Sequence, residues 1–213
     1  MKFSPSPSSP SPKLFYIVGA SGSGKDTLLK KYREHLAEKK LPVVIAHRYI
    51  TRENSEKNQA TENFISLSAN EYQLKKSQGL FLLDWEANNS CYAIGIEVAQ
   101  WFAMGFSVVI NGSRAYLPML KEAIRASHFG RHISPHNDVV TISINVPETI
   151  LLERLRLRQR ESEAAIELRM KRHRNLMALG NTDNTIDNSG AISASVIKLA
   201  NIIDKATQRS CAS

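Results

Sequence analysis

The sequence predicts an α/β fold in which helices cover both faces of a parallel central sheet, as a three-layer domain. The first observation is the apolar run LFYIV at residues 14–18, which has the length and composition of a strand buried on both faces. The second is the glycine-rich stretch that follows it, and then an amphipathic pattern that predicts a helix to about Lys40. The third is the alternation of strand and helix patterns along the rest of the chain, which is typical of a parallel sheet.

The remaining elements follow from their apolar periodicity. Further strands are predicted at 43–46, 81–83, 106–110 and 139–144, and helices near 69–78, 94–103, 115–126, 149–178 and 191–207. Polar residues at about 48–90 interrupt this alternation, which indicates an inserted acceptor-binding region. A single domain is expected at 13–207, between a disordered Ser/Pro-rich tail at 1–12 and a C-terminal tail at 208–213.

Composition indicates a soluble protein with a polyanionic partner. Apolar residues make up 42% and charged residues 23% of the chain, and no apolar run has the ~20 residues that span a bilayer. The net charge of +8 attracts nucleic acid, anionic membranes and phosphorylated small molecules alike. The two cysteines, Cys91 and Cys211, indicate no disulfide framework, so a cytoplasmic location is expected.

Residues 19–27, GASGSGKDT, match the phosphate-binding pattern GxxxxGK between a strand and a helix. Small residues let successive backbone N–H groups converge on a phosphate, and Lys25 adds positive charge near the transferred group. The usual Ser or Thr after the lysine, which binds Mg²⁺, is replaced by Asp26. ATP and Mg²⁺ are thus the expected cofactors, with Asp26 the candidate metal ligand, helped by Thr27. The expected nucleotide-binding residues are Gly19, Ala20, Ser21, Gly22, Ser23, Gly24, Lys25, Asp26 and Thr27.

Two groups of arginines are candidates for phosphate contacts. Arg48 and Arg52, in HRYITR, have the even spacing that directs both side chains to one side of an extended segment. Arg154, Arg158 and Arg160, in ERLRLRQRE, are predicted to close over the transferred phosphoryl group from a lid at about 150–178. The leucines expected to anchor this lid are at positions 151, 152, 155 and 157.

Several stretches together resemble the ribose 1,5-bisphosphate phosphokinase family, in the guanylate-kinase-like branch of P-loop kinases. They are GASGSGKD, RYITR, ENFISLSANEY, GLFLLDWEANNSCYAIG, GFSVVINGSRAYLP, ERLRLRQRE and IDNSG, in that order. The resemblance implies transfer of the ATP γ-phosphoryl group to ribose 1,5-bisphosphate, giving 5-phosphoribosyl 1-diphosphate and ADP, within phosphonate breakdown. It also implies that Lys25 and the three lid arginines are catalytic.

The same resemblance assigns the remaining site residues. It places Tyr92, Asn111, Gly112, Ser113 and Arg114 at the acceptor, with Arg48 and Arg52, and it places Asp187 and Asn188 near the adenine. The chain departs from the family pattern in having Tyr92-Ala93 where a Tyr-Gly pair is usual, and asparagine at 88 or 89 where histidine is common.

Other functions remain alternatives. A guanylate or other nucleoside monophosphate kinase shares the loop and lid, but of its acceptor pattern TTRxPRxGE only Thr51 and Arg52 are present. A non-catalytic guanylate-kinase-like binding module is a second alternative, although Lys25 and the lid arginines are intact. The expected partner is a small phosphorylated sugar, with no nucleic acid and no membrane, and a homodimer is left open.

Overall fold

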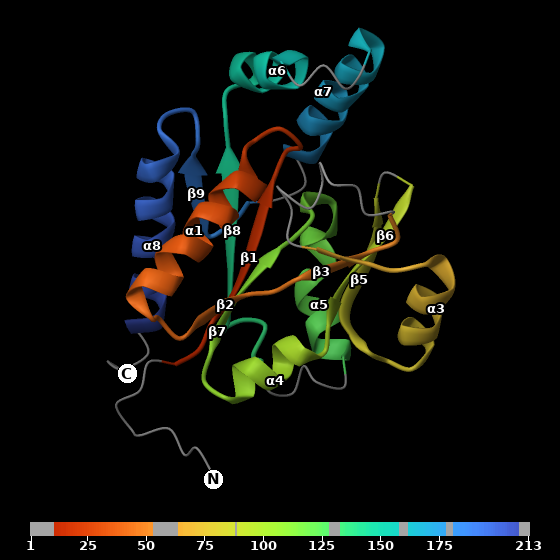
Figure 1. The fold of residues 1–213 in the computed structure, drawn as a ribbon, viewed down its shortest axis with the longest axis vertical. Coiled ribbons are helices and arrows are strands. Elements are labelled where there is room, and N and C mark those ends of the chain that lie inside the picture. Colours follow the sequence, from red (N-terminus) through yellow and green to blue (C-terminus); the bar gives the residue numbers. More distant parts are fainter. Residues whose placement is uncertain are drawn as a thin grey trace.

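A five-stranded parallel sheet forms the centre of the protein in the computed structural model, which describes residues 11–52, 64–87, 89–127, 133–157, 162–177 and 181–208 (Figure 1). Its strands lie in the order β2-β7-β1-β8-β9, so the first strand is central. Their bounds are Leu14–Gly19 (β1), Val43–Ile45 (β2), Ser107–Asn111 (β7), Val139–Asn145 (β8) and Asn184–Asp187 (β9). Because all five run parallel, their carboxyl ends meet at one edge of the sheet.

Helices cover both faces of this sheet. Helices α1 (Lys25–Lys39) and α8 (Ile192–Gln208) pack on the face to which β1 contributes Phe15 and Ile17. Helices α4 (Glu97–Ala103) and α5 (Leu120–Ala126) pack on the other face. Burial of β1 on both sides explains its unbroken apolar sequence, and the predicted three-layer α/β fold is confirmed.

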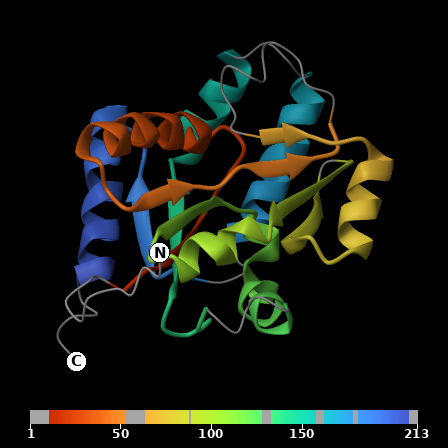
Figure 2. The same ribbon diagram turned by 60° about the horizontal axis from the view of Figure 1, so that its bottom comes forward.

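The insertion forms a second sheet beside the first. It has the order β4-β3-β6-β5, with bounds Arg48–Ile50 (β3), Phe64–Ser66 (β4), Phe81–Ala87 (β5) and Ser90–Gly95 (β6). Helix α3 (Ala69–Ser77) belongs to this side of the molecule, opposite α8 in both views (Figures 1 and 2). The strand expected at 81–83 is therefore not in the parallel sheet: it pairs antiparallel with β6, to which residue 94, expected in a helix, also belongs.

Two expected helices are divided. The pattern at 149–178 forms α6 (Glu148–Leu157) and α7 (Glu163–Met177), which lie above the carboxyl ends of the central strands in Figure 1. The pattern at 115–126 begins as a 3₁₀ helix, Arg114–Met119, that contains Pro118 and then continues as α5. Proline has no N–H to donate to an α-helical ladder, which accounts for the different first turn.

Helices α6 and α7 pack through a small apolar cluster. Leu151 and Leu155 of α6 are buried against Ile166 and Met170 of α7. Leu157, expected to anchor the lid, is instead 74% exposed, because it lies at the end of α6 beyond the contact with α7. No helix within the described residues has the length and apolar character needed to cross a membrane.

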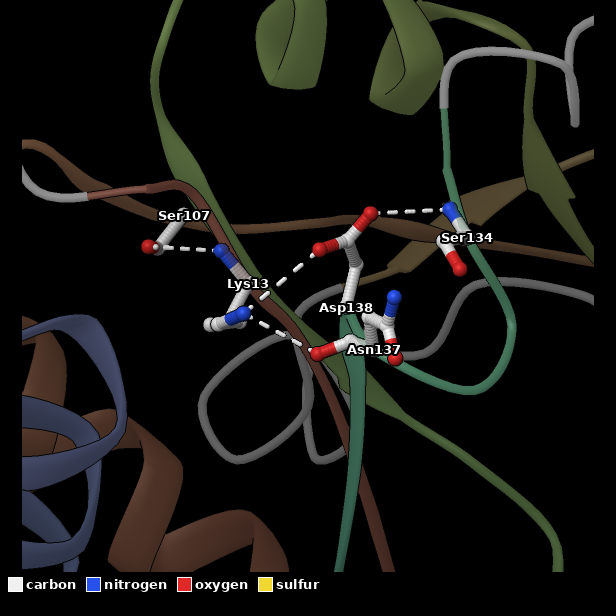
Figure 3. A network of polar contacts seen from close by, with 5 residues as sticks. All are labelled: Lys13, Ser107, Ser134, Asn137 and Asp138. Carbon is white, nitrogen blue, oxygen red and sulfur yellow. Dashed lines mark hydrogen bonds and ion pairs between the residues drawn. The ribbon is translucent and has the colours of Figure 1, made fainter. Parts of the chain in front are cut away.

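A polar network joins three strands at the amino end of the central sheet (Figure 3). Lys13, just before β1, donates from its backbone N to Ser107 Oγ at 3.1 Å and from Nζ to the Asn137 carbonyl at 3.0 Å. Its ammonium also lies 3.5 Å from Asp138, which accepts a hydrogen bond from Ser134 N at 2.8 Å. The charged groups here compensate one another and hold β1, β7 and β8 in register.

Candidate active site

The glycine-rich loop leaves the carboxyl end of β1 and leads into α1. Gly22 and Gly24 have positive φ values of 97° and 82°, which residues with a Cβ rarely adopt. A Cβ at Gly24 would also lie 2.6 Å from Asn188 Nδ2. The loop therefore depends on glycine at these two positions for its tight turn.

Three side chains form a polar chain at the end of this loop. Asn111, the last residue of β7, accepts a hydrogen bond from Lys25 Nζ through its Oδ1. Its Nδ2 donates to Asp26 Oδ1 at 2.7 Å. One amide group thus contacts both charged residues that begin α1.

Arg48 joins the loop to the second sheet. It lies on β3, and its guanidinium is 3.6 Å from the same oxygen of Asp26. The guanidinium also lies 5.7 Å from the centre of the Tyr92 ring, within the range of a cation–π contact. Arg52, four residues later, lies over the Phe64 ring at 5.0 Å. The structure therefore places Arg48 beside both Asp26 and Tyr92, whereas Arg52 lies past the end of β3, over Phe64.

Arg114 is a buried cation at the start of the 3₁₀ helix, with 8% of its surface exposed. It donates to Ser143 Oγ, and to Asn145 Oδ1 at 3.2 Å, so neutral groups on β8 hold it. Burial lowers the pKa of Arg114. Its buried Nε has no hydrogen-bond partner within the described part of the chain. A charged group held in this way is suited to an anionic ligand.

Gly112 and Ser113 connect β7 to Arg114 by a close approach to Tyr16 of β1. A Cβ on Gly112 would overlap the Tyr16 ring. Ser113 N donates to the Tyr16 hydroxyl at 2.9 Å, and that hydroxyl in turn donates to the Ser113 carbonyl at 3.2 Å. These contacts fix the segment between Asn111 and Arg114.

Arg154 contacts the loop backbone from α6. Its guanidinium donates to the carbonyls of Ser23 at 3.4 Å and Asn188 at 3.0 Å. Asn188 also donates from its side chain to the Ser23 carbonyl, at 2.7 Å. The predicted lid residues Arg158 and Arg160 lie outside the described residues, as do position 88 and the Ser/Pro-rich segment up to residue 10.

Helix α7 contributes cations that the sequence analysis did not single out. Arg169 donates to Ser21 Oγ in the loop at 2.5 Å, and Arg172 and His173 line the same cavity. Burial lowers the pKa of His173 below its usual 6.5. The sequence did contain a signal for Arg169 and His173. Each lies three residues after an apolar residue, Ile166 or Met170, and this spacing places it on the same side of a helix as that residue.

The glycine-rich loop, the second sheet and α7 all contribute residues to one cavity of about 700 Å³, whose lining does not include Asn111, Arg154 or Asn188. Trp85 and Tyr92 form part of its wall, with parallel rings 5.7 Å apart. Among the described lining residues, Asp26 is the single acid, whereas six are lysine or arginine. The six are Lys25, Arg48, Arg52, Arg114, Arg169 and Arg172. Such a cavity is suited to a ligand with several negative charges.

Six of the eleven predicted nucleotide-binding residues lie outside the cavity lining, namely Gly22, Ser23, Gly24, Thr27, Asp187 and Asn188. Thr27 is exposed in the first turn of α1. Asp187 is exposed at the end of β9, and hydrogen bonds from the side chain and then the backbone N of Ser189, the latter at 2.9 Å, lower its pKa. The described residues include no cluster of three or more histidine, cysteine or acidic side chains around a metal position. Asp26 is therefore the acidic metal-ligand candidate at this cavity.

Comparisons with known proteins agree with these observations. The chain is similar to ribose 1,5-bisphosphate phosphokinase PhnN of Desulfomicrobium baculatum, with 40% identity over 195 residues, 92% of this chain and 96% of the relative. It is 42% identical over 165 residues to the protein of the same name from Thiobacillus denitrificans, covering 78% of each chain. No protein-family model matches the chain.

A solved structure agrees with the fold. The guanylate kinase from Anaplasma phagocytophilum superposes with a TM-score of 0.63, covering 95% of this chain and 90% of that one. Only 16% of residues are identical, so this likeness concerns the fold alone. The predicted guanylate-kinase-like architecture is thereby confirmed.

Proposed function

The chain belongs to the ribose 1,5-bisphosphate phosphokinase family, and we propose that it transfers the γ-phosphoryl group of ATP to ribose 1,5-bisphosphate. The products are 5-phospho-α-D-ribose 1-diphosphate and ADP. The observation that carries the proposal is the cavity in which the phosphate loop and the second sheet meet, whose described lining has six lysine or arginine residues and one acid.

The contact between Arg48 and Asp26 explains how donor and acceptor meet. Lys25 and Asp26 belong to the ATP-binding loop, whereas Arg48 extends from the sheet formed by the insertion. Arg48 lies 3.6 Å from Asp26, so a phosphate on this arginine would lie beside the terminal phosphate of ATP in the loop. Two polyanions can approach this closely only where cations offset their repulsion.

The reaction needs positioning more than proton transfer. An oxygen of the acceptor 1-phosphate, already ionised at neutral pH, forms a bond to the γ-phosphorus, while the bond to the β,γ-bridging oxygen breaks and ADP leaves. No general base is required. Lys25 would donate one N–H of its ammonium to the phosphate while another keeps the hydrogen bond to Asn111, and the lid arginines would neutralise charge on the transferred group.

Asp26 fits a magnesium role. Its carboxylate lines the cavity directly after Lys25, and Mg²⁺ in phosphotransferases is held by one or two protein oxygens together with phosphate oxygens. Bound there, Mg²⁺ would offset the charge of the β- and γ-phosphates. Arg48, beside the same carboxylate, offsets its negative charge.

The two acceptor phosphates are assigned according to which arginine lies beside Asp26. We assign the reacting 1-phosphate to Arg48, beside Asp26, and the 5-phosphate to Arg52, past the end of β3. The Tyr92 ring, stacked on Trp85, would face the sugar. Arg114 supplies a further buried positive charge to the cavity lining.

At the nucleotide end of the cavity, one assignment has structural support and the others stay predictions. Asn188 and Arg154 both contact the Ser23 carbonyl, which supports a role in shaping the loop around ATP. A place for Asp187 and Asn188 beside the adenine stays a prediction, as do the contacts of Arg158 and Arg160. The cytoplasmic location, a role in phosphonate breakdown, and independence from nucleic acid and membranes rest on the sequence and its resemblance alone.

The substrate assignment is tested by ADP release from purified protein with MgATP and one of two acceptors, ribose 1,5-bisphosphate or GMP. We expect a kcat/KM for ribose 1,5-bisphosphate at least about tenfold above that for GMP, since the acceptor site is built from arginines around phosphates. Faster turnover of GMP would instead assign the chain to nucleotide kinases.

A further inference from the structure

Asp26 and Asn111 reverse the charge arrangement that is usual in P-loop enzymes, which have a neutral residue after the loop lysine and a carboxylate elsewhere in the magnesium site. In those enzymes a Ser or Thr follows the loop lysine, and an aspartate elsewhere in the site completes the magnesium shell. Here the loop position holds the carboxylate of Asp26. Asn111 ends β7, which pairs directly with β1, so a neutral amide occupies the neighbouring strand end. Among the described residues of the cavity lining, the carboxylate therefore comes from the first turn of α1 and not from the end of β7.

The hydrogen bonds explain why these two residue types depend on each other. Asn111 is buried, with 7% of its surface exposed, and its amide uses one donor toward Asp26 and one acceptor toward Lys25. An aspartate at position 111 would accept from Lys25 but would place a second carboxylate within hydrogen-bond distance of Asp26. Two like charges at that separation in a poorly solvated site repel strongly.

We propose that Asn111 is a positioning residue that holds Lys25 and Asp26 in place, so that Asp26 supplies from the loop the metal-binding carboxylate that other P-loop enzymes supply from another element. Asn111 therefore acts on the nucleotide side of the cavity, in place of the acceptor contact implied by the sequence resemblance. The inference rests on the proposed use of MgATP, although it does not depend on which acceptor is used.

A double-mutant cycle tests this arrangement. The four proteins are the native chain, Asp26→Ser, Asn111→Asp, and the double variant, which has a neutral residue after the loop lysine and a carboxylate at position 111. Isothermal titration calorimetry gives ATP affinity with excess Mg²⁺ and again with EDTA, with no acceptor present. Asn201→Asp, the same change on the exposed face of α8, is the matched control and should leave both affinities unchanged.

We expect each single variant to bind MgATP about tenfold more weakly or worse, and the double variant to recover to within about fivefold of the native chain, because contacting residues are strongly non-additive. With EDTA, Asp26→Ser should bind ATP at least as tightly as the native chain, since a negative charge beside the triphosphate has been removed. If the losses of the two single variants simply add in the double variant, the proposal is refuted.

Asn111→Ser covers the case in which Asn111→Asp does not fold, as judged by the absence of a cooperative thermal transition. Serine is too short to reach both Lys25 and Asp26, so MgATP affinity should fall about tenfold while the acceptor KM stays within about twofold. The reverse pattern, with a raised acceptor KM and unchanged MgATP affinity, would contradict the proposal and would support a direct contact between Asn111 and the acceptor. A chain inactive on ribose 1,5-bisphosphate can still show the cycle in ATP binding, so the two proposals fail separately.

Discussion

The two ends of the central sheet use charged residues in opposite ways. At the amino end, Lys13 and Asp138 lie 3.5 Å apart and hydrogen bonds to neighbouring strands complete the network (Figure 3). At the carboxyl end, the described cavity lining has six lysine or arginine residues against the single acid Asp26. Balanced charge at one end stabilises the strand register, whereas concentrated positive charge at the other is suited to polyanionic substrates. The two ends of the same strands therefore separate a structural role from the proposed catalytic one.

The contrast between the amino and carboxyl ends of the central sheet is tested most strongly by replacing one lysine at each end with alanine. Lys25→Ala should lower kcat about 10³-fold or more, because positive charge at the transferred phosphoryl group is lost. Lys13→Ala is the matched change at the amino end, and it should lower the unfolding midpoint in urea while leaving kcat within about twofold. Initial-rate measurements and urea unfolding on both variants check this. Equal effects of the two variants on kcat would show that the ends are not functionally distinct.

Arg48→Lys should have the next largest effect. Lysine keeps the charge but cannot grip a phosphate in two places, so the KM for ribose 1,5-bisphosphate should rise about 10- to 100-fold, with a smaller change in the KM for ATP. Steady-state kinetics with each substrate varied in turn measure both constants. Arg125→Lys, on the exposed surface of α5, is the control. A rise confined to the KM for ATP would move Arg48 out of the acceptor site.

Asp138→Asn should act on stability alone. The change removes a partly buried ion pair with Lys13 and weakens the hydrogen bond from Ser134 N, so we expect a loss of about 1–2 kcal/mol in the free energy of unfolding. Urea denaturation measures that loss, and kcat should be unchanged at a temperature where the protein is folded. A clear fall in kcat of the folded variant would contradict the separation of roles.

His173 should give the smallest effect, as a dependence of stability on pH. Burial lowers the pKa of His173 in the folded protein, and the nearby Arg114 lowers it further, although Glu148 opposes this. The unfolded chain then binds a proton near pH 6.5 that the folded chain does not, so stability falls as the pH drops through and below that value. His173→Gln should flatten part of this dependence in urea unfolding curves. The remainder is expected from His47, whose pKa burial also lowers.

Local patterns predicted the central fold well. The apolar run of β1, the helical spacing of α1 and the glycines between them are all properties of adjacent residues, and the structure has each of them. The partner of a strand is not such a property, so the sequence predicted a strand at 81–83 without its antiparallel pairing to β6. Strand β9 was missed because it has four residues and only Ile186 among them is buried.

The residues of the candidate site also fall into two groups: those that a contiguous motif predicts, and those that only the folded chain brings together. The loop motif alone identified Lys25 and Asp26, because its pattern is contiguous in the sequence. The contact between Asp26 and Asn111 joins residues 85 positions apart, so only the folded chain shows that one amide holds both loop residues. Arg172 is another residue that only the fold identifies. It lines the cavity because α7, a helix separate from α6, packs beside it.

The most direct test of the proposed reaction follows phosphorus atoms by ³¹P NMR in a mixture of the protein, MgATP and ribose 1,5-bisphosphate. The proposal predicts that the γ-phosphate signal of ATP declines while a sugar 1-diphosphate appears, with the 5-phosphate remaining a monoester. Lys25→Ala should abolish the new signals. The proposed reaction would be contradicted if the 1-phosphate signal of ribose 1,5-bisphosphate stayed unchanged while the same preparation converted GMP to GDP, which would show that the protein is active on another acceptor.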